Sequence, residues 1–313
     1  MENTDELRLE EAYQAWREAL TGEHKSIWSR AVTAWQDYVY YRCISTAFEA
    51  ASQGSTKQQL PYGLMNTYHS AFYRSLMVEL RSEIGGERDK LLKDKHGEHS
   101  LSAILNSIAD TKITRAGLFR VNGMDYEYAA RKALDEKEIY DALSKEGAGI
   151  IPSTHAGWRM SSDLHQRIDE LTGKSEHNRS PEDIIPNKIF LDAGCTLRNH
   201  TVKLLLFVNK HIAHAATKES IELESRTVPS KIGSEDIEET FGALIGTFDM
   251  LSSDLFCWGH YSFSLDLSSK LNGVEKAFGL ESGVIDLNKT YRDFTNKLDT
   301  KIRKWRPIKP PPS

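Results

Sequence analysis

The stretch PNKIFLDAGCTLRNHTVKLLLFVNKHIAHAA (residues 186–216) has the spacing of a long amphipathic helix. Pro186 stands at its first turn, where the missing backbone N–H costs nothing because no helical partner exists there. Apolar residues then recur at intervals of three, four or seven, which places them on one helix face. The stretch therefore predicts a long helix whose buried face is formed by Phe190, Ala193, Leu197, Leu204 and Val208.

The same helical periodicity recurs in four further segments, at residues 28–43, 64–80, 237–255 and 287–305. A shorter helix is predicted in SLSAILNSIAD (100–110), with Ser100 as its N-cap, and Ser234 is the predicted cap of the helix over 237–255. The predicted fold class is all-α. Its core is expected to contain four helices, namely those over 28–43 and 64–80 and the two that follow Pro186.

Between residues 112 and 186 the periodicity weakens, and this range is interpreted as a mixed insertion on the surface of the bundle. The stretches GLFRVNG (117–123) and AGIIPS (148–153) are candidates for extended pieces in a small hairpin. The polar segment TGKSEHNRSPED (172–183) is predicted to be a mobile loop. The chain is thus divided into a first half-bundle (1–111), the insertion (112–186), a second half-bundle (187–260) and C-terminal helices with a Pro-rich tail (261–313).

The composition excludes several classes of protein. The net charge of -5 gives no overall positive field, so any RNA contact needs a local basic patch. No apolar run approaches the roughly 20 residues of a membrane span, and the acidic start lacks the apolar core of a secretion signal. The three cysteines show no paired metal spacing, and no phosphate-cradling glycine loop is present. A cytoplasmic protein without cofactor, metal or membrane contact is expected.

Two histidines, His211 and His214, stand near the end of the helix that begins at Pro186. At about 100° per residue, both fall within about 40° of His200 around the helix axis, and Lys210 neighbours His214. Three interpretations remain open. Cationic side chains complement the negative end of a helix. Two histidines one turn apart can hold zinc, although no further ligand stands at a partnering spacing. A histidine beside an ammonium can also perform acid–base chemistry on a phosphate ester.

The string NKHIAHA (209–215) resembles the end of a HEPN domain (higher eukaryotes and prokaryotes nucleotide-binding), and more narrowly its AbiU-type abortive-infection subgroup. A looser match is SAFYRSLMVELRSEIGG (70–86) followed by HSLSAILNSI (99–108). The resemblance covers roughly residues 26–108 and 186–258. It implies an all-helical, up-down four-helix bundle that pairs as a homodimer, in which an arginine and a histidine from each copy converge and cleave RNA without a metal.

Carried over to this chain, the resemblance assigns the family histidine to His214, its polar companion to Asn209 and the lysine to Lys210. His211 is added as a residue that could orient them. Where the family pattern has arginine, this chain has Val208, and an ammonium such as that of Lys210 lacks the two-pronged fork of a guanidinium. The function implied is RNA or nucleotide recognition, with metal-independent cleavage in phage defence. The alternative is a catalytically inert binding or sensor module that acts through a protein partner.

Overall fold

The computed structural model describes residues 2–22, 26–53, 62–85, 100–127, 137, 156–208, 231–258, 271, 274–278, 280 and 286–304. Within these residues the fold is mostly helical, as predicted, and it contains no strand. In chain order the helices are α1 (Glu2–Thr21), α2 (Ile27–Gln53), α3 (Tyr62–Ile84), α4 (Leu101–Ala109), α5 (Arg115–Val121), α7 (Ala156–Thr172), α8 (Lys188–Phe207), α10 (Ser234–Asp249), α12 (Val274–Ala277) and α13 (Leu287–Lys304). None of the helices so described is long and apolar enough to cross a membrane.

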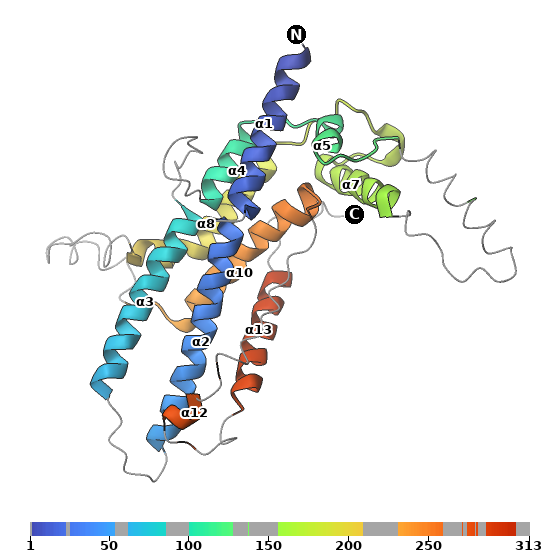
Figure 1. The fold of residues 1–313 in the computed structure, drawn as a ribbon. Helices are drawn as coiled ribbons and strands as arrows, with labels where there is room; N and C mark the ends of the chain where they lie inside the picture. The colour runs from blue at the N-terminus through green and yellow to red at the C-terminus, as the bar shows by residue number, and fades with distance from the viewer. Residues whose placement is uncertain are drawn as a thin grey trace, which may run out of the picture.

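The four helices expected to form the core do pack against one another. Helix α2 contacts α3 and α10, and α8 contacts α3 and α10. Two further helices belong to the same core, because α4 lies against α8, and α13 lies against α10 and α2. In Figure 1, α2, α3 and α13 run along the length of the molecule while α10 passes diagonally behind α2. The core is therefore larger than four helices.

Helix α10 lies largely within the core, with 11 of its 16 residues buried. All seven residues of its predicted apolar stripe, which runs into the turn after the helix, are buried. The ring of Phe241 meets that of Trp35 edge-on at 5.0 Å, and Phe248 stacks on Trp28 at 4.8 Å. The α-helical geometry ends at Asp249, and residues Met250–Leu255 form a π-helical turn. The apolar stripe of α10 therefore continues into a π-helical turn. The spacing of the apolar residues in the sequence does not reveal this change from α-helix to π-helix.

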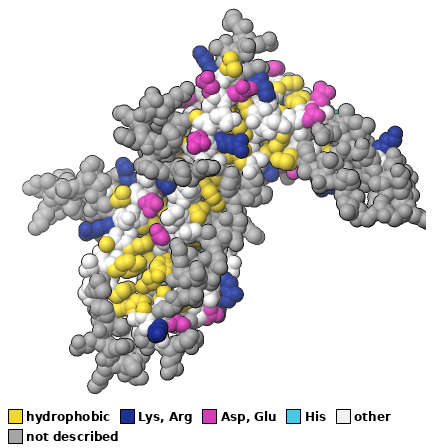
Figure 2. All heavy atoms as spheres, in the orientation of Figure 1, with side chains coloured by type: hydrophobic (Ala, Val, Ile, Leu, Met, Phe, Trp, Pro, Cys, Tyr) yellow, Lys and Arg dark blue, Asp and Glu magenta, His cyan; other side chains and the backbone are white. Residues whose placement is uncertain are grey.

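Two details of the predicted helices differ from the structure. Helix α10 is capped at Gly233, one residue before the predicted Ser234, and the Gly233 N–H donates to Asp236 Oδ2 at 3.0 Å. The predicted stripe of α3 is buried only in its second half, since Tyr68 is 38% exposed. Its ring lies 6.0 Å from that of Tyr41 on α2, but its other side faces solvent. Figure 2 shows hydrophobic side chains gathered over α3 and α2 on this face.

In the described part of 112–186, a helix stands where one of the two extended pieces was expected. Residues 117–121 of GLFRVNG lie in α5, so the prediction of an extended piece there was wrong. AGIIPS lies outside the described residues. Among the described residues the one β-type pairing is an isolated antiparallel bridge between Thr114 and Ile184. Helix α5 packs on α1 and α7, and α7 reaches the π-turn that follows α10. Figure 1 shows α5 and α7 together beside one end of the bundle.

Ser100 caps α4 as predicted: its Oγ accepts a hydrogen bond from the Ala103 N–H at 3.2 Å. Ser100→Ala is expected to lower the free energy of unfolding by about 1 kcal/mol, because one helix-terminal N–H loses its acceptor. Ser175→Ala is the matched control, since Ser175 precedes a short 3-10 turn (Glu176–Asn178) and makes no capping bond there. Urea denaturation of both variants measures the difference. Equal stability of the two variants would contradict the assignment of the cap.

Candidate functional site

The four residues proposed from the sequence, Asn209, Lys210, His211 and His214, lie outside the described residues. The structure describes the helix that leads to them. Helix α8 runs from Lys188 to Phe207, and Val208 keeps helical backbone angles with its N–H bonded to the Leu204 and Leu205 carbonyls. Val208, which stands where the family pattern has arginine, is fully buried. The described part of α8 therefore shows that this position faces the core.

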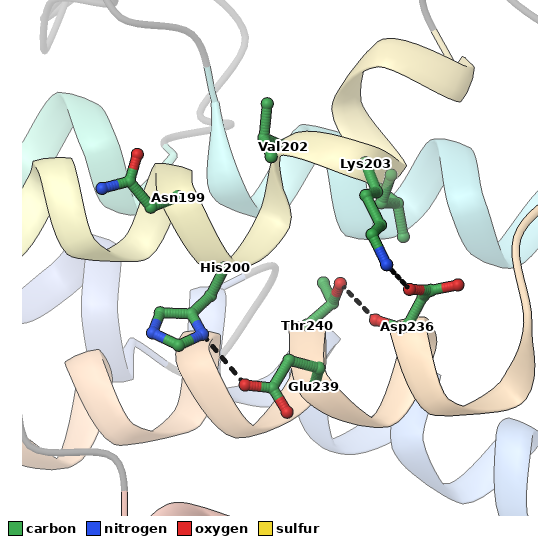
Figure 3. A pocket seen from close by; sticks show the side chains of 8 residues that line it. Asn199, His200, Val202, Lys203, Asp236, Glu239 and Thr240 are labelled. Carbon is green, nitrogen blue, oxygen red and sulfur yellow. Dashed lines mark hydrogen bonds and ion pairs between the residues drawn. The ribbon is translucent and has the colours of Figure 1, made fainter. Parts of the chain in front are cut away.

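A shallow groove between α8 and α10 is lined by polar side chains together with Val202 and Leu204 (Figure 3). Its volume is about 220 Å³, below the roughly 300–1,000 Å³ of typical ligand pockets. His200 and Lys203 come from α8, and Asp236 and Glu239 come from α10. The groove is too small to enclose a nucleotide, so a ligand there would be held at an open edge.

His200 is held by a carboxylate. Its Nδ1 lies 2.9 Å from Glu239 Oε1, and the other carboxylate oxygen, Oε2, lies 3.3 Å from Lys301 Nζ on α13. A carboxylate only accepts hydrogen bonds, so the proton of the imidazole sits on Nδ1 and the neutral ring keeps a lone pair on Nε2. The His200 side chain is 40% exposed. An accessible, carboxylate-oriented imidazole is the arrangement of a general base.

The second pair in the groove is Lys203 with Asp236, whose Nζ and Oδ1 lie 2.9 Å apart. The Gly233 N–H and the Lys203 ammonium together hold the pKa of Asp236 below its usual range. The hydrogen bond to Asp236 in turn raises the pKa of Lys203. The Lys203 charge is thus offset within the groove. Figure 2 likewise shows basic and acidic side chains interspersed among the described residues of the face it displays.

A second polar cluster is buried beneath α5 and α7. The fully buried Arg115 guanidinium donates from Nε to Asp183 Oδ2 at 3.1 Å and from Nη2 to Asp169 Oδ1 at 2.8 Å. Its Nη1 points to His165 Nδ1 at 3.2 Å, and His165 Nε2 lies 3.0 Å from the Tyr126 carbonyl. Arginine is a donor only, so His165 accepts at Nδ1 and carries its proton on Nε2. The charged and polar groups of this cluster are paired with one another, so we interpret it as a structural network.

The network fixes the segment 172–183, which the sequence predicted to be a mobile loop. Arg179 donates to Asp169 from Nε and Nη2 at 2.9 and 2.6 Å, and Lys174 pairs with Asp183. The backbone N–H of Arg115 also donates to the Asp183 carbonyl at 2.8 Å. Arg179 and Asp183 thus tie this segment to α7 and α5, while Glu176, whose side chain is 72% exposed, stays at the surface.

Acid is expected to weaken this network in two steps. Burial, aided by nearby Arg179 and Arg115, lowers the pKa of His165. Burial alone would raise the pKa of Asp183, but bonds from Lys174, the Ser180 N–H and Arg115 outweigh it and lower that pKa. Both groups bind protons more readily in the unfolded chain, so stability falls as pH drops, first below about 6.5 for His165 and then below about 3.9 for Asp183.

The measurement is the free energy of unfolding against pH for wild type and His165→Gln. The amide of glutamine can accept from Arg115 and donate to the Tyr126 carbonyl, but it does not titrate. The loss just below pH 6.5 is expected to disappear in this variant, while the loss at lower pH persists. An unchanged pH profile would show that His165 does not couple protonation to folding.

Neither the His200–Glu239 pair nor the Arg115 network was predicted as a site. In the sequence, His200 is only the residue from which the angles of His211 and His214 around the helix are measured. Glu239 lies 39 residues further along the chain, so their contact has no local signal. Within the described residues no group of three or more His, Cys, Asp or Glu side chains is arranged to hold a metal ion. No family model, curated protein or solved structure matches the chain.

Proposed function

We propose that this chain is a HEPN-like helical protein that recognises RNA or a nucleotide and cleaves RNA without a metal ion. The continuity of α8 is the observation that carries the proposal. The α-helix is unbroken from Lys188 to Phe207, and Val208, where a π-helical turn begins, keeps right-handed helical angles just before the motif Asn209–His214 in the sequence. A motif at the end of a rigid core helix is well placed to hold catalytic groups in fixed geometry.

The register of α8 favours an accessible site. Val208 faces the core, whereas the Lys203 side chain is 68% exposed. If the α-helical period of about 100° per residue continued through the motif, His214 would lie about 120° from Val208 and within about 20° of Lys203 around the helix axis. This would put His214 on the side of α8 that carries the groove.

In this proposal His214 takes the proton from a ribose 2′-hydroxyl, whose oxygen attacks the neighbouring phosphorus as the bond to the 5′-oxygen breaks. The 5′-oxygen leaves with a proton from a second donor, either His211 or water. Lys210 offsets the negative charge that develops on the phosphate, and Asn209 orients the reacting groups. The imidazole and ammonium supply general acid–base and electrostatic catalysis without a bound metal.

A second candidate is favoured by the burial of Val208. Because this chain has valine at position 208, it offers no guanidinium there to stabilise the charge of a phosphate. The position also faces the core, where a phosphate could not reach it. An inert binding or sensor module that acts through protein contacts fits this observation. A role in phage defence rests on the resemblance alone and is compatible with both candidates.

The test uses the purified full chain with end-labelled RNA and tRNA in the presence of EDTA. Cleavage under these conditions is expected for the enzyme, together with slow growth of a host that expresses it. Binding without cleavage, and normal growth, would favour the inert module. Absence of both cleavage and RNA binding at low salt, or cleavage only when a divalent metal is added, would contradict the proposed function.

A further inference from the structure

His200 presents one ring nitrogen to solvent in a fixed orientation. Its Nδ1 lies 2.9 Å from Glu239 Oε1, and the Lys301 ammonium, 3.3 Å from Oε2, holds the other oxygen of the same carboxylate. The proton of the neutral ring therefore stays on Nδ1 and the lone pair stays on Nε2. Figure 3 shows the second ring nitrogen of His200 on the side away from Glu239. Because the side chain is 40% exposed, Nε2 is accessible to a reagent.

The groove gives this imidazole no available hydroxyl or thiol to activate. Among the residues that line it, Thr240 carries the one hydroxyl, and Thr240 is only 1% exposed. Its Oγ1 donates to the Asp236 carbonyl at 2.8 Å, so the hydroxyl proton is bound to the helix backbone (Figure 3). Histidine can also act as a nucleophile itself and form a covalent bond to the group that is transferred. The groove therefore favours direct attack by His200 Nε2.

The size and charge of the groove suit a phosphoryl group. Its volume of about 220 Å³ equals about seven waters at about 30 Å³ each, which is room for a group of four heavy atoms. Its charges balance, because Lys203 pairs with Asp236 and Lys301 pairs with Glu239. Lys203 neighbours His200 on α8, three residues along the helix. Its side chain is 68% exposed, so its ammonium can exchange Asp236 for one of the three acceptor oxygens that a phosphoryl group brings.

We propose that His200 Nε2 is a phosphoryl-acceptor site, modified by donors that carry a phosphorus–nitrogen bond. The Nε2 lone pair attacks phosphorus, and the bond from phosphorus to the donor nitrogen breaks with its electron pair. The donor nitrogen is already protonated in the zwitterion and leaves as the free amine, so no further proton is needed. The imidazole becomes a cation that keeps its proton on Nδ1, where the Glu239 carboxylate stabilises it. This site lies outside the motif 209–214 and does not rest on the proposed function.

The test is phosphorylation of the purified full chain with phosphoramidate, followed by phosphorus NMR and mapping of the modified histidines by mass spectrometry. Phosphorus NMR separates the Nε2 isomer of phosphohistidine from the Nδ1 isomer. The Nε2 isomer is expected at His200, where it should form about tenfold faster than at His177, because a carboxylate behind an imidazole raises its basicity. His177 is exposed between α7 and α8 and serves as the internal reference. His200→Gln is expected to remove the fast-forming adduct.

Variants of Glu239 separate orientation from ordinary exposure. Glu239→Ala is expected to slow modification of His200 by about 10- to 100-fold and to give a mixture of both isomers. Glu239→Gln keeps an oxygen that accepts from Nδ1, so it should be slow but retain the Nε2 isomer. Glu235→Ala, at an exposed residue of α10 outside the groove, is the matched control and should react like wild type. An adduct on Nδ1, no adduct at His200, or equal rates at His200 and His177 would overturn the proposal. RNA cleavage is not measured, so this site and the proposed function can fail separately.

Discussion

His214→Ala is expected to reduce RNA cleavage by a factor of about 10²–10⁴, the usual contribution of a positioned general acid or base. Within the motif Asn209–His214, only the imidazoles of His211 and His214 can exchange a proton near neutral pH. The melting temperature is expected to change little, since the register of α8 predicts that this side chain lies off the buried face. The measurement is the initial rate of RNA cleavage in EDTA.

Two other histidine variants make this result specific. His177→Ala is the matched control, because His177 is exposed in the segment between α7 and α8 and should leave cleavage unchanged. His200→Ala examines the groove, where the imidazole is oriented by Glu239. His200 stands 14 residues before His214, and in a continuous α-helix this separation would be about 21 Å, too long for both to act on the same phosphate within one subunit. Full activity of His214→Ala together with loss of activity in His200→Ala would move the catalytic site to the groove.

The long helices could be predicted because each buries a face whose period is visible in the sequence. The stripe of α10 is the clearest example, because every apolar residue in it is buried in the structure. Tyr68 shows the limit of this reasoning, because periodicity identifies an apolar face but cannot say whether a neighbour covers it. The same limit applies to Leu191 and Val202, whose exposure on α8 became evident only from the structure.

Short elements and distant contacts were beyond the reach of local patterns. The α5 segment contains Phe119 and Val121, which favour strands. It nevertheless forms a helix, and the Thr114 hydroxyl that accepts from the Gly117 N–H at 3.1 Å was the available signal for its start. The pairs His200–Glu239 and Arg115–Asp183 join residues 39 and 68 positions apart. No periodic pattern encodes such contacts. The site at 209–214 stays a prediction.

Arg115→Leu is expected to lower the free energy of unfolding by about 3–5 kcal/mol, the cost of removing one partner from a buried ion pair. The substitution leaves Asp183, which is 4% exposed, and Asp169 facing an apolar side chain. It also removes the donor to His165 Nδ1. Arg120→Leu is the matched control on the same helix: its 36% exposed side chain pairs with Glu10 at 3.2 Å, and exposed pairs contribute only about 0–1 kcal/mol.

Two further variants separate the charge of Arg115 from its shape. Arg115→Lys keeps the charge but offers one ammonium where three groups converge, so it is expected to recover only part of the lost stability. Replacing Arg115, Asp169 and Asp183 together by apolar residues removes the buried carboxylates that Arg115→Leu leaves uncompensated. Arg179 and Lys174 lose their partners in this triple variant, but Lys174 is 41% exposed and Arg179 keeps Glu176 at 3.7 Å, so the variant is expected to be less damaging than Arg115→Leu alone. Hydrogen exchange of the amides in 156–183 shows whether α7 and the following segment open first. A loss below about 1 kcal/mol in Arg115→Leu, or equal losses in the single and triple variants, would mean that this network does not hold α5 and α7 together.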